Sequence, residues 1–139
     1  MTLETLASLV TIMMIPIGWS LPWLGECGKP YGGGYDVKTS IAYVCDNENK
    51  QVVQMEKYHE IGHHFYSLLS EKEKSEYSKL YEKDKSKIYN FYREYGRTNV
   101  EESFAEDVMG IFIDIPPRQL QKQRILLIKK YLRNHNLTL

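Results

Sequence analysis

Two histidines and a glutamate are the side chains best suited to chemistry in this sequence of 139 residues; they lie in the segment His59-Glu60-Ile61-Gly62-His63. Residues four apart on a helix stand one turn above each other, so both imidazoles can bind a single metal ion. Glu60 is rotated by about 100° from His59, so it can reach a water molecule on that metal rather than the metal itself. This pattern is typical of hydrolytic zinc sites, in which the glutamate is the general base.

A competing interpretation treats His59 and His63 as residues that line a core, with Glu60 as ordinary surface charge. Gly62 argues against it, because glycine in a helix interior costs roughly 0.5–1 kcal/mol relative to alanine. A metal-binding helix tolerates this cost where a second backbone must pack closely against it. The glycine therefore favours a site shared with another segment.

A catalytic zinc ion takes three protein ligands and keeps one position open, so a third ligand must come from elsewhere. The candidates are His64, His135, Glu101, Glu102 and Glu106. His64 follows His63 directly and points about 100° away from it on the same helix. His135 lies in a polar tail that we expect to fray. The acidic segment is therefore the better source of the third ligand.

Glu102 and Glu106 are four residues apart and share a helical face with Met109 and Ile113. Carboxylates on such an apolar stripe are costly unless they are paired or bound to metal. We expect one of the two to bind the metal and the other to accept a hydrogen bond from a ligand histidine. Glu101 lies off this stripe and is interpreted as an acid that favours the helix N-terminus.

The segment YGRTNVEESFAE at residues 95–106, taken with HEIGH at 59–63, resembles the catalytic-domain signature of anthrax toxin lethal factor and its relatives. These are gluzincin metalloendopeptidases with the pattern HExxH, a YxxTN-like run and ExFAE. The resemblance covers about residues 58–107, and Ser103 departs from it where the family often has an aromatic residue. It implies one Zn²⁺ per chain, bound by His59, His63 and Glu102.

The same resemblance implies a role for three further residues. Glu60 would be the general base, Tyr95 would donate its hydroxyl to the reacting carbonyl oxygen, and Glu106 would be the carboxylate behind a ligand histidine. The expected activity is that of a zinc metalloendopeptidase, which hydrolyses a peptide or protein substrate through a zinc-bound water activated by Glu60. Two alternatives stay open: a regulatory metallopeptidase of phage or mobile-element type that cleaves a repressor, and a non-catalytic binding module that retains the zincin fold.

The N-terminal third is expected to be rich in strands. Residues 3–10 predict a short helix, 11–17 a buried strand with Pro16 at its end or at a sheet edge, 18–36 a loop, and 39–45 a second strand. An exposed edge of the strand at 39–45 could accept an extended peptide by strand addition.

The rest of the chain is expected to be helical. Helices are predicted at 51–69, at 71–84 with a capping box of Ser70 and Glu73, from a cap at Thr98 or Asn99 to 113, and at 118–134 with Pro117 at the first position. The segment 84–96 is not assigned. We therefore expect an α+β fold, a minimal zincin- or gluzincin-like domain in which a small antiparallel or mixed sheet packs on the HExxH helix and on a helical C-terminal half. One domain would span residues 1–139, strand-rich over about 11–45 and helical with the zinc site over 51–134.

Composition limits the partners. Eighteen basic and eighteen acidic residues balance, so the positive charge expected of a nucleic-acid binder is missing. The apolar stretch at 6–24 is interrupted by Pro16, Gly18 and Pro22, which excludes stable membrane insertion. It also lacks a basic start, so we find no convincing signal peptide and expect a cytoplasmic chain as encoded, or one exported by a non-classical route. Cys27 and Cys45 are then expected to be free thiols. No feature indicates an oligomeric state.

Overall fold

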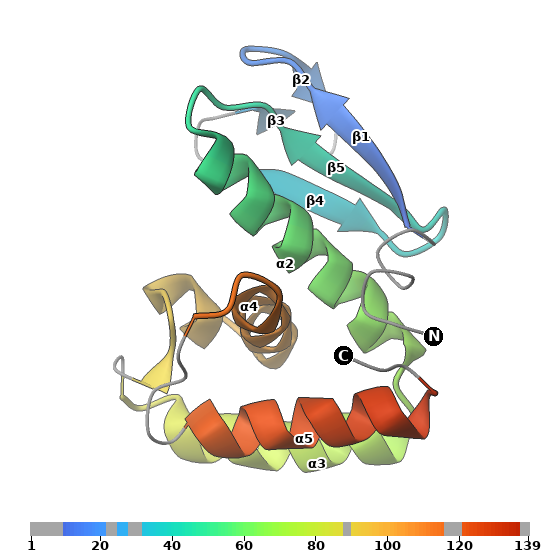
Figure 1. Cartoon of the computed structure of the whole chain (residues 1–139), viewed down its shortest axis with the longest axis vertical. Helices are drawn as coiled ribbons and strands as arrows, with labels where there is room; N and C mark the ends of the chain where they lie inside the picture. Colours follow the sequence, from blue (N-terminus) through green and yellow to red (C-terminus); the bar gives the residue numbers. More distant parts are fainter. Residues whose placement is uncertain (1–9, 22–24, 28–31, 88–89, 116–120, 137–139) are drawn as a thin grey trace.

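The computed structural model describes residues 10–21, 25–27, 32–87, 90–115 and 121–136. Within them the chain has the expected α+β organisation, with strands first and helices after (Figure 1). The strands are β1 (Thr11–Ile15), β2 (Ser20–Leu21), β3 (Gly25–Glu26), β4 (Gly33–Asp36) and β5 (Ile41–Cys45). The helices are α2 (Lys50–Leu68), α3 (Glu71–Asp84), the 3₁₀ helix η2 (Glu94–Arg97), α4 (Val100–Phe112) and α5 (Gln121–Asn134).

The main sheet is mixed and has the strand order β1-β5-β4. β1 runs parallel to β5, with Ile15 beside Cys45, and β4 runs antiparallel to β5, with Asp36 beside Ile41. β2 and β3 form a separate antiparallel pair. The expectation of an exposed edge on the strand at 39–45 is therefore wrong, because β5 is the central strand. β4 lies at the edge instead.

Two other expectations for the strand region need correction. The strand at 11–17 ends at Ile15, just before Pro16, but it is not buried: Met13 and Met14 are 44% and 49% exposed. It is an edge strand, and α2 packs on β5 and β4. The predicted loop at 18–36 contains the three strands β2, β3 and β4. The sequence of β4, GGYD, has little intrinsic strand preference and is held by pairing with β5. The predicted helix at 3–10 falls almost wholly outside the described residues.

The helix predictions agree more closely with the structure. α2 and α3 match the predicted segments to within a residue, and the capping box of Ser70 and Glu73 is formed. Asn99, one of the two predicted caps, accepts a hydrogen bond from the backbone N–H of Glu102 at 2.9 Å and begins α4. The predicted start of the last helix falls partly within residues 116–120, outside the described residues, and α5 is described from Gln121.

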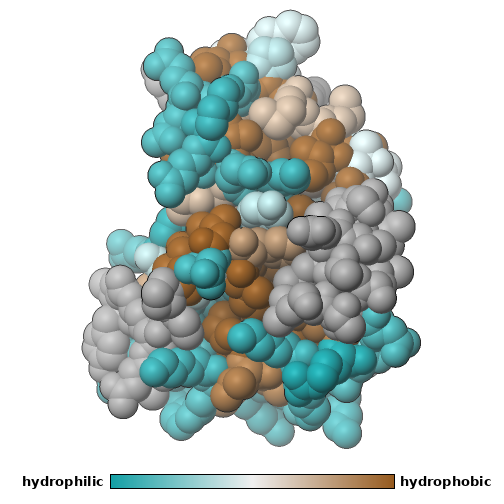
Figure 2. All heavy atoms as spheres, in the orientation of Figure 1, coloured by the Kyte–Doolittle hydropathy of each residue, from teal (hydrophilic) through white to brown (hydrophobic). Residues whose placement is uncertain are grey.

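α4 is the central helix of the molecule. It contacts α2 on one side and the pair α3 and α5 on the other (Figure 1). The main hydrophobic core fills this space and consists of Phe65, Leu69, Tyr77, Tyr81, Phe91, Phe104, Val108, Ile128, Tyr131 and Leu132. On the face shown in Figure 2, hydrophobic residues gather between α2 and the helix pair α3 and α5. Hydrophilic residues dominate over α3 and α5 at the bottom of the view. One face of α4 therefore lies against α2 and the opposite face lies in the core.

A buried polar network holds the core face of α4. The fully buried Arg124 on α5 donates to Asp107 on α4 at 2.9 Å and to Asp84 on α3 at 2.7 Å. The hydroxyl of Tyr77 lies 2.8 Å from that of Ser103 and donates to Asp107 at 2.6 Å. Ser103, the departure from the family pattern, thus has a polar partner in the core. Because these contacts join three helices, they fix how α4 is rotated towards α2.

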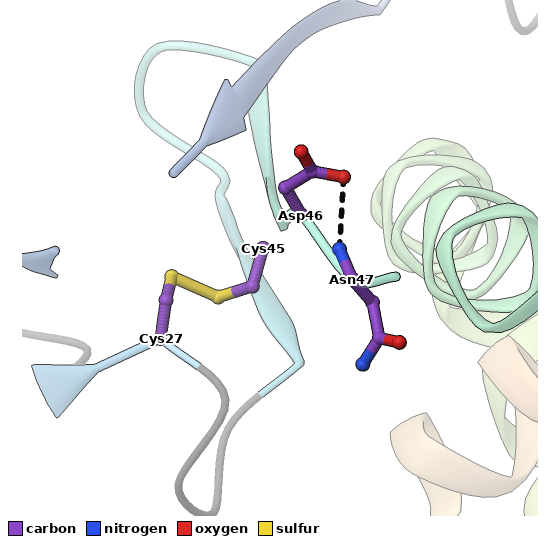
Figure 3. Close-up of a disulfide and its surroundings, with 4 residues drawn as sticks. All are labelled: Cys27, Cys45, Asp46 and Asn47. Atoms are coloured by element: carbon purple, nitrogen blue, oxygen red, sulfur yellow. Dashed lines mark hydrogen bonds between the residues drawn. A yellow bond between two sulfur atoms is a disulfide. The ribbon is translucent and has the colours of Figure 1, made fainter. Parts of the chain in front are cut away.

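Cys27 and Cys45 form a disulfide (Figure 3). The interpretation of both as free thiols is therefore wrong. It relied on the expectation of a cytoplasmic chain, which says nothing about the distance between the two residues. Their Cα atoms lie 5.3 Å apart, and the bond ties the residue that follows β3 to the end of β5. Among the described residues, no helix has the length and apolar character needed to span a membrane.

Candidate metal centre

The backbones of α2 and α4 make close contact where the two helices cross. A Cβ atom built on Gly62 would lie 2.6 Å from Cα of Ala105, too close for any side chain. This explains the glycine in the helix interior, as the sequence predicts. Gly62 lies between His59 and His63 in the sequence, and Ala105 lies between Glu102 and Glu106, so the crossing brings the two segments face to face.

Three side chains converge above this crossing. The Nε2 atom of His59 lies 2.9 Å from Oε2 of Glu102 and 3.2 Å from Nε2 of His63, which lies 3.2 Å from the same carboxylate oxygen. Tetrahedral zinc with bonds of about 2.0 Å separates its ligand atoms by about 3.3 Å. The three atoms are thus within a few tenths of an ångström of the separation that a zinc ion requires. Of the two acids left open by the sequence, Glu102 occupies the ligand position.

Each histidine contacts a second carboxylate through its other ring nitrogen. His59 donates from Nδ1 to Oε2 of Glu106 at 3.0 Å, as the sequence predicts for one of the two acids. His63 donates from Nδ1 to Oε2 of Glu101 at 3.0 Å. The interpretation of Glu101 as only a helix-terminus acid missed this contact. Its position next to Glu102, in the first turn of the helix, was the available signal.

The hydrogen-bonding pattern favours positive charge, from protons or from a metal ion, at the point where the three atoms converge. A carboxylate only accepts hydrogen bonds, so Nδ1 of each histidine carries hydrogen. The Nε2 atoms of the neutral rings and the oxygen of Glu102 would then be three acceptors in contact, which repel one another unless protons or a metal ion lie between them. The residues present therefore fit a divalent metal ion.

The pKa values of the two histidines and of Glu102 also favour positive charge at this point. Burial alone lowers the pKa of His59, but hydrogen bonds to Glu102 and Glu106 outweigh it and raise the pKa to about 10. Burial also lowers the pKa of His63, and hydrogen bonds to Glu101 and Glu102 raise it to about 9. Although burial opposes it, hydrogen bonds from both histidines hold the pKa of Glu102 well below its usual range. Positive charge is therefore strongly favoured at this point.

Glu60 is buried beside the cluster, with 3% of its surface exposed. Its Oε2 atom has no hydrogen-bond partner among the described residues, which is costly for a carboxylate. Burial raises the pKa of Glu60 to about 7, against the opposing effect of the two histidines. An unpaired carboxylate with a pKa near neutrality suits a group that takes up and returns a proton.

A cavity of about 330 Å³ opens onto this carboxylate. It lies between the edge strand β4, helix α2 and the segment that includes η2, and is lined by Gly32, Gly33, Glu56, His59, Glu60, Arg93 and Tyr95. Tyr95 is 51% exposed and is therefore not a core residue. Its ring centroid lies 5.7 Å from that of His59, and the carboxylate of Glu102 lies near its hydroxyl. Burial and the nearby carboxylate raise the pKa of Tyr95 to about 12, so the hydroxyl keeps its proton at neutral pH.

Arg93 is a site residue that the sequence did not predict, because no local pattern links it to Glu106, 13 positions away. Its guanidinium donates two hydrogen bonds of 2.6 Å to the carboxylate of Glu106 and a third, of 3.3 Å, to Glu56. Glu106 is 1% exposed, and although burial opposes it, Arg93 and His59 hold the pKa of Glu106 below its usual value. The chain Arg93–Glu106–His59 thus supports one ligand from behind.

The other two histidines lie away from the cluster. His64 is packed, and its Nδ1 accepts a hydrogen bond of 2.6 Å from the hydroxyl of Tyr35 on β4. His135 does not fray: its Nε2 lies 2.9 Å from Oε1 of Glu73, and its ring meets Phe65 edge to face. The prediction that neither residue is the third ligand agrees with the geometry.

Comparisons with family models, with curated proteins and with solved structures find no match for this chain. The functional argument therefore rests on the residues themselves. In the described part of the chain, His59, His63 and Glu102 form a group in which one ligand atom from each lies within 4.8 Å of the others.

Proposed function

We propose that this chain is a zinc-dependent endopeptidase with one Zn²⁺ held by His59, His63 and Glu102. The observation that carries the proposal is the pairing of two features at one cavity. Three ligand atoms converge to distances of 2.9–3.2 Å, and the buried, unpartnered Oε2 of Glu60 lies beside them. Two imidazoles and one carboxylate form a ligand set typical of catalytic zinc in hydrolases.

When bound, zinc supplies Lewis acidity: it lowers the pKa of a coordinated water molecule and polarises the carbonyl of the scissile bond. Glu60 takes the proton of the attacking water on Oε2 and then delivers it to the leaving amine. In the metal-free chain, burial raises the pKa of Glu60 to about 7, which favours proton uptake by this carboxylate. Burial at the cavity wall keeps competing solvent away from this carboxylate.

Tyr95 provides the second contribution from the chain. Tyr95 lines the cavity, and in the proposed reaction its hydroxyl donates a hydrogen bond to the carbonyl oxygen of the substrate as negative charge develops there. A donor aimed at charge present only in the transition state accelerates the reaction rather than substrate binding. Because Tyr95 is half exposed, a substrate in the cavity can reach it.

A peptide is the substrate class that the surroundings favour. β4 lies at the edge of the sheet and reaches the cavity through Gly33, which lines it, so an extended peptide could pair with this edge. Gly33 allows β4 to come close: a Cβ atom there would lie 2.5 Å from the carbonyl oxygen of Tyr43 and 3.5 Å from Oε1 of Glu60. The resemblance of residues 58–107 to gluzincin endopeptidases favours the same substrate class.

Metal analysis combined with a peptide-library digest tests the proposal. The purified chain, loaded with zinc and freed of excess metal, should hold one zinc per chain and cleave a subset of the peptides. A chelator should abolish cleavage, and added zinc should restore it. Stoichiometric zinc without any cleavage would instead indicate the binding module, and a failure to bind zinc would overturn the proposal.

A further inference from the structure

The two histidines of the cluster are supported by carboxylates in very different surroundings. Glu106, behind His59, is 1% exposed and is paired with Arg93 through two hydrogen bonds. Glu101, behind His63, has half of its side-chain surface exposed, and no cation of the described residues forms an ion pair with it within 4 Å other than His63. Yet its distance to the ring nitrogen is the same, 3.0 Å in both pairs.

Glu101 and Glu102 reach opposite nitrogens of one imidazole. Glu101 accepts from Nδ1 of His63, and Glu102 lies at Nε2 of the same ring. The two acids are consecutive in the first turn of α4, which the cap residue Asn99 fixes. The carboxylate at Nδ1 fixes the tautomer, so that the Nε2 lone pair is directed at the point where the three ligand atoms converge.

We propose that Glu101 is a positioning residue that orients the His63 imidazole for metal binding. This inference rests on the proposed role of His63 as a zinc ligand. A carboxylate hydrogen-bonded to a ligand histidine sets the ring orientation and raises its basicity, and the loss of such a partner typically weakens metal binding by about 10–100-fold. Glu101 performs for His63 the task that Glu106 performs for His59, without the buried arginine.

A role at the helix terminus alone predicts a different result. An acid in the first turn stabilises a helix through the macrodipole wherever the helix lies. Glu71 in the first turn of α3 is such an acid, and it forms an ion pair with Lys74 at 3.8 Å on the same helix. Substitution of Glu71 therefore measures the terminus effect without any contact to a histidine.

The test compares Glu101→Ala and Glu101→Gln with the control Glu71→Ala. Zinc affinity is measured by competition with a chromophoric chelator, the cobalt(II)-loaded proteins are compared by their visible spectra, and the metal-free proteins are compared by melting temperature. We expect Glu101→Ala to bind zinc about 10–100-fold more weakly and to shift the cobalt bands. Glu101→Gln, which keeps an acceptor oxygen without the charge, should fall between it and the wild type. Glu71→Ala should keep the wild-type affinity and spectrum.

Wild-type affinity and an unchanged cobalt spectrum in folded Glu101→Ala would overturn the inference and leave the proposed function standing. An equal loss of affinity in Glu71→Ala would also overturn it, because the effect would then come from helix stability. A wild-type chain that binds no zinc would overturn the proposed function together with this inference.

Discussion

Of the roles proposed for single residues, the catalytic role of Tyr95 is the easiest to disprove. Eleven tyrosines occur in the chain, and most could serve as core residues. Tyr95 instead lines the cavity and is half exposed. A catalytic role and a packing role can be distinguished by experiment. Loss of a transition-state donor lowers kcat, whereas loss of a packing residue lowers the stability of the fold.

We predict that Tyr95→Phe lowers kcat by roughly 10²–10³-fold and changes KM little, because the hydrogen bond to the oxyanion forms only in the transition state. Zinc content and melting temperature should stay near those of the wild type, since the ring is retained. Tyr58→Phe is the matched control, because Tyr58 stacks on Phe112 and does not line the cavity. A rise in KM with an unchanged kcat would place Tyr95 in substrate binding instead.

The ligand set makes a second prediction at this scale. Alanine at His59, His63 or Glu102 removes one of three ligands, so each variant should lose bound zinc and the stability that zinc adds to the folded chain. Metal analysis after dialysis and melting curves with and without zinc measure both effects. Glu94→Ala is the control, since Glu94 is exposed and pairs with Arg97. Full zinc occupancy in Glu102→Ala would show that another acid, with Glu106 the first candidate, is the third ligand.

At the scale of elements, the candidate site lies where α2 and α4 cross. The limits of these helices and of α3 follow from local signals, namely the caps at Ser70 and Asn99 and the spacing of apolar residues. The contacts that complete the site do not. Arg93 reaches Glu106 across 13 positions and Glu101 reaches His63 across 38, so only the packing of the elements reveals them. β4 was missed because its strand character comes from pairing with β5 rather than from its own residues.

The close crossing of α2 and α4 at Gly62 can be tested by substitution. Gly62→Ala places a methyl group 2.6 Å from Cα of Ala105, and overpacking of this kind typically costs about 1–3 kcal/mol. The gain in helix propensity is only about 0.5–1 kcal/mol, so the free energy of unfolding should fall and zinc should bind more weakly as the helices separate. Urea denaturation and chelator competition measure the two effects. Gln54→Ala, at an exposed position of α2, is the control. A more stable variant with unchanged zinc binding would contradict the close crossing.

At the scale of the whole molecule, the proposed metal site and the disulfide lie in different parts of the fold. The proposed ligands come from α2 and α4, whereas the Cys27–Cys45 bond joins the residue after β3 to β5 (Figure 3). The mixed sheet and the helical second half were predictable as a class from the order of apolar strands and capped helices. The bridge was not, because two cysteines 18 residues apart carry no information on their separation in space.

We predict that the double variant Cys27→Ser, Cys45→Ser is less stable by roughly 3 kcal/mol, the loop-closure contribution expected for a short loop, and keeps its zinc affinity. A thiol titration of the unfolded, unreduced wild type should find no free thiol. Denaturation curves of the variant and of the reduced wild type should agree with each other. Two titratable thiols in the wild type would contradict the bridge.

The central claim is that zinc and Glu60 together hydrolyse peptide bonds, and Glu60→Gln tests it most directly. Glutamine has nearly the same shape but cannot take the proton of the attacking water, and a general base contributes typically about 10²–10⁴-fold to the rate. We predict that this variant retains one zinc per chain and a cooperative melting transition, and that its kcat on a cleaved peptide falls by that factor. Glu82→Gln, exposed on α3, should cleave like the wild type. Undiminished turnover by zinc-loaded Glu60→Gln would contradict the account.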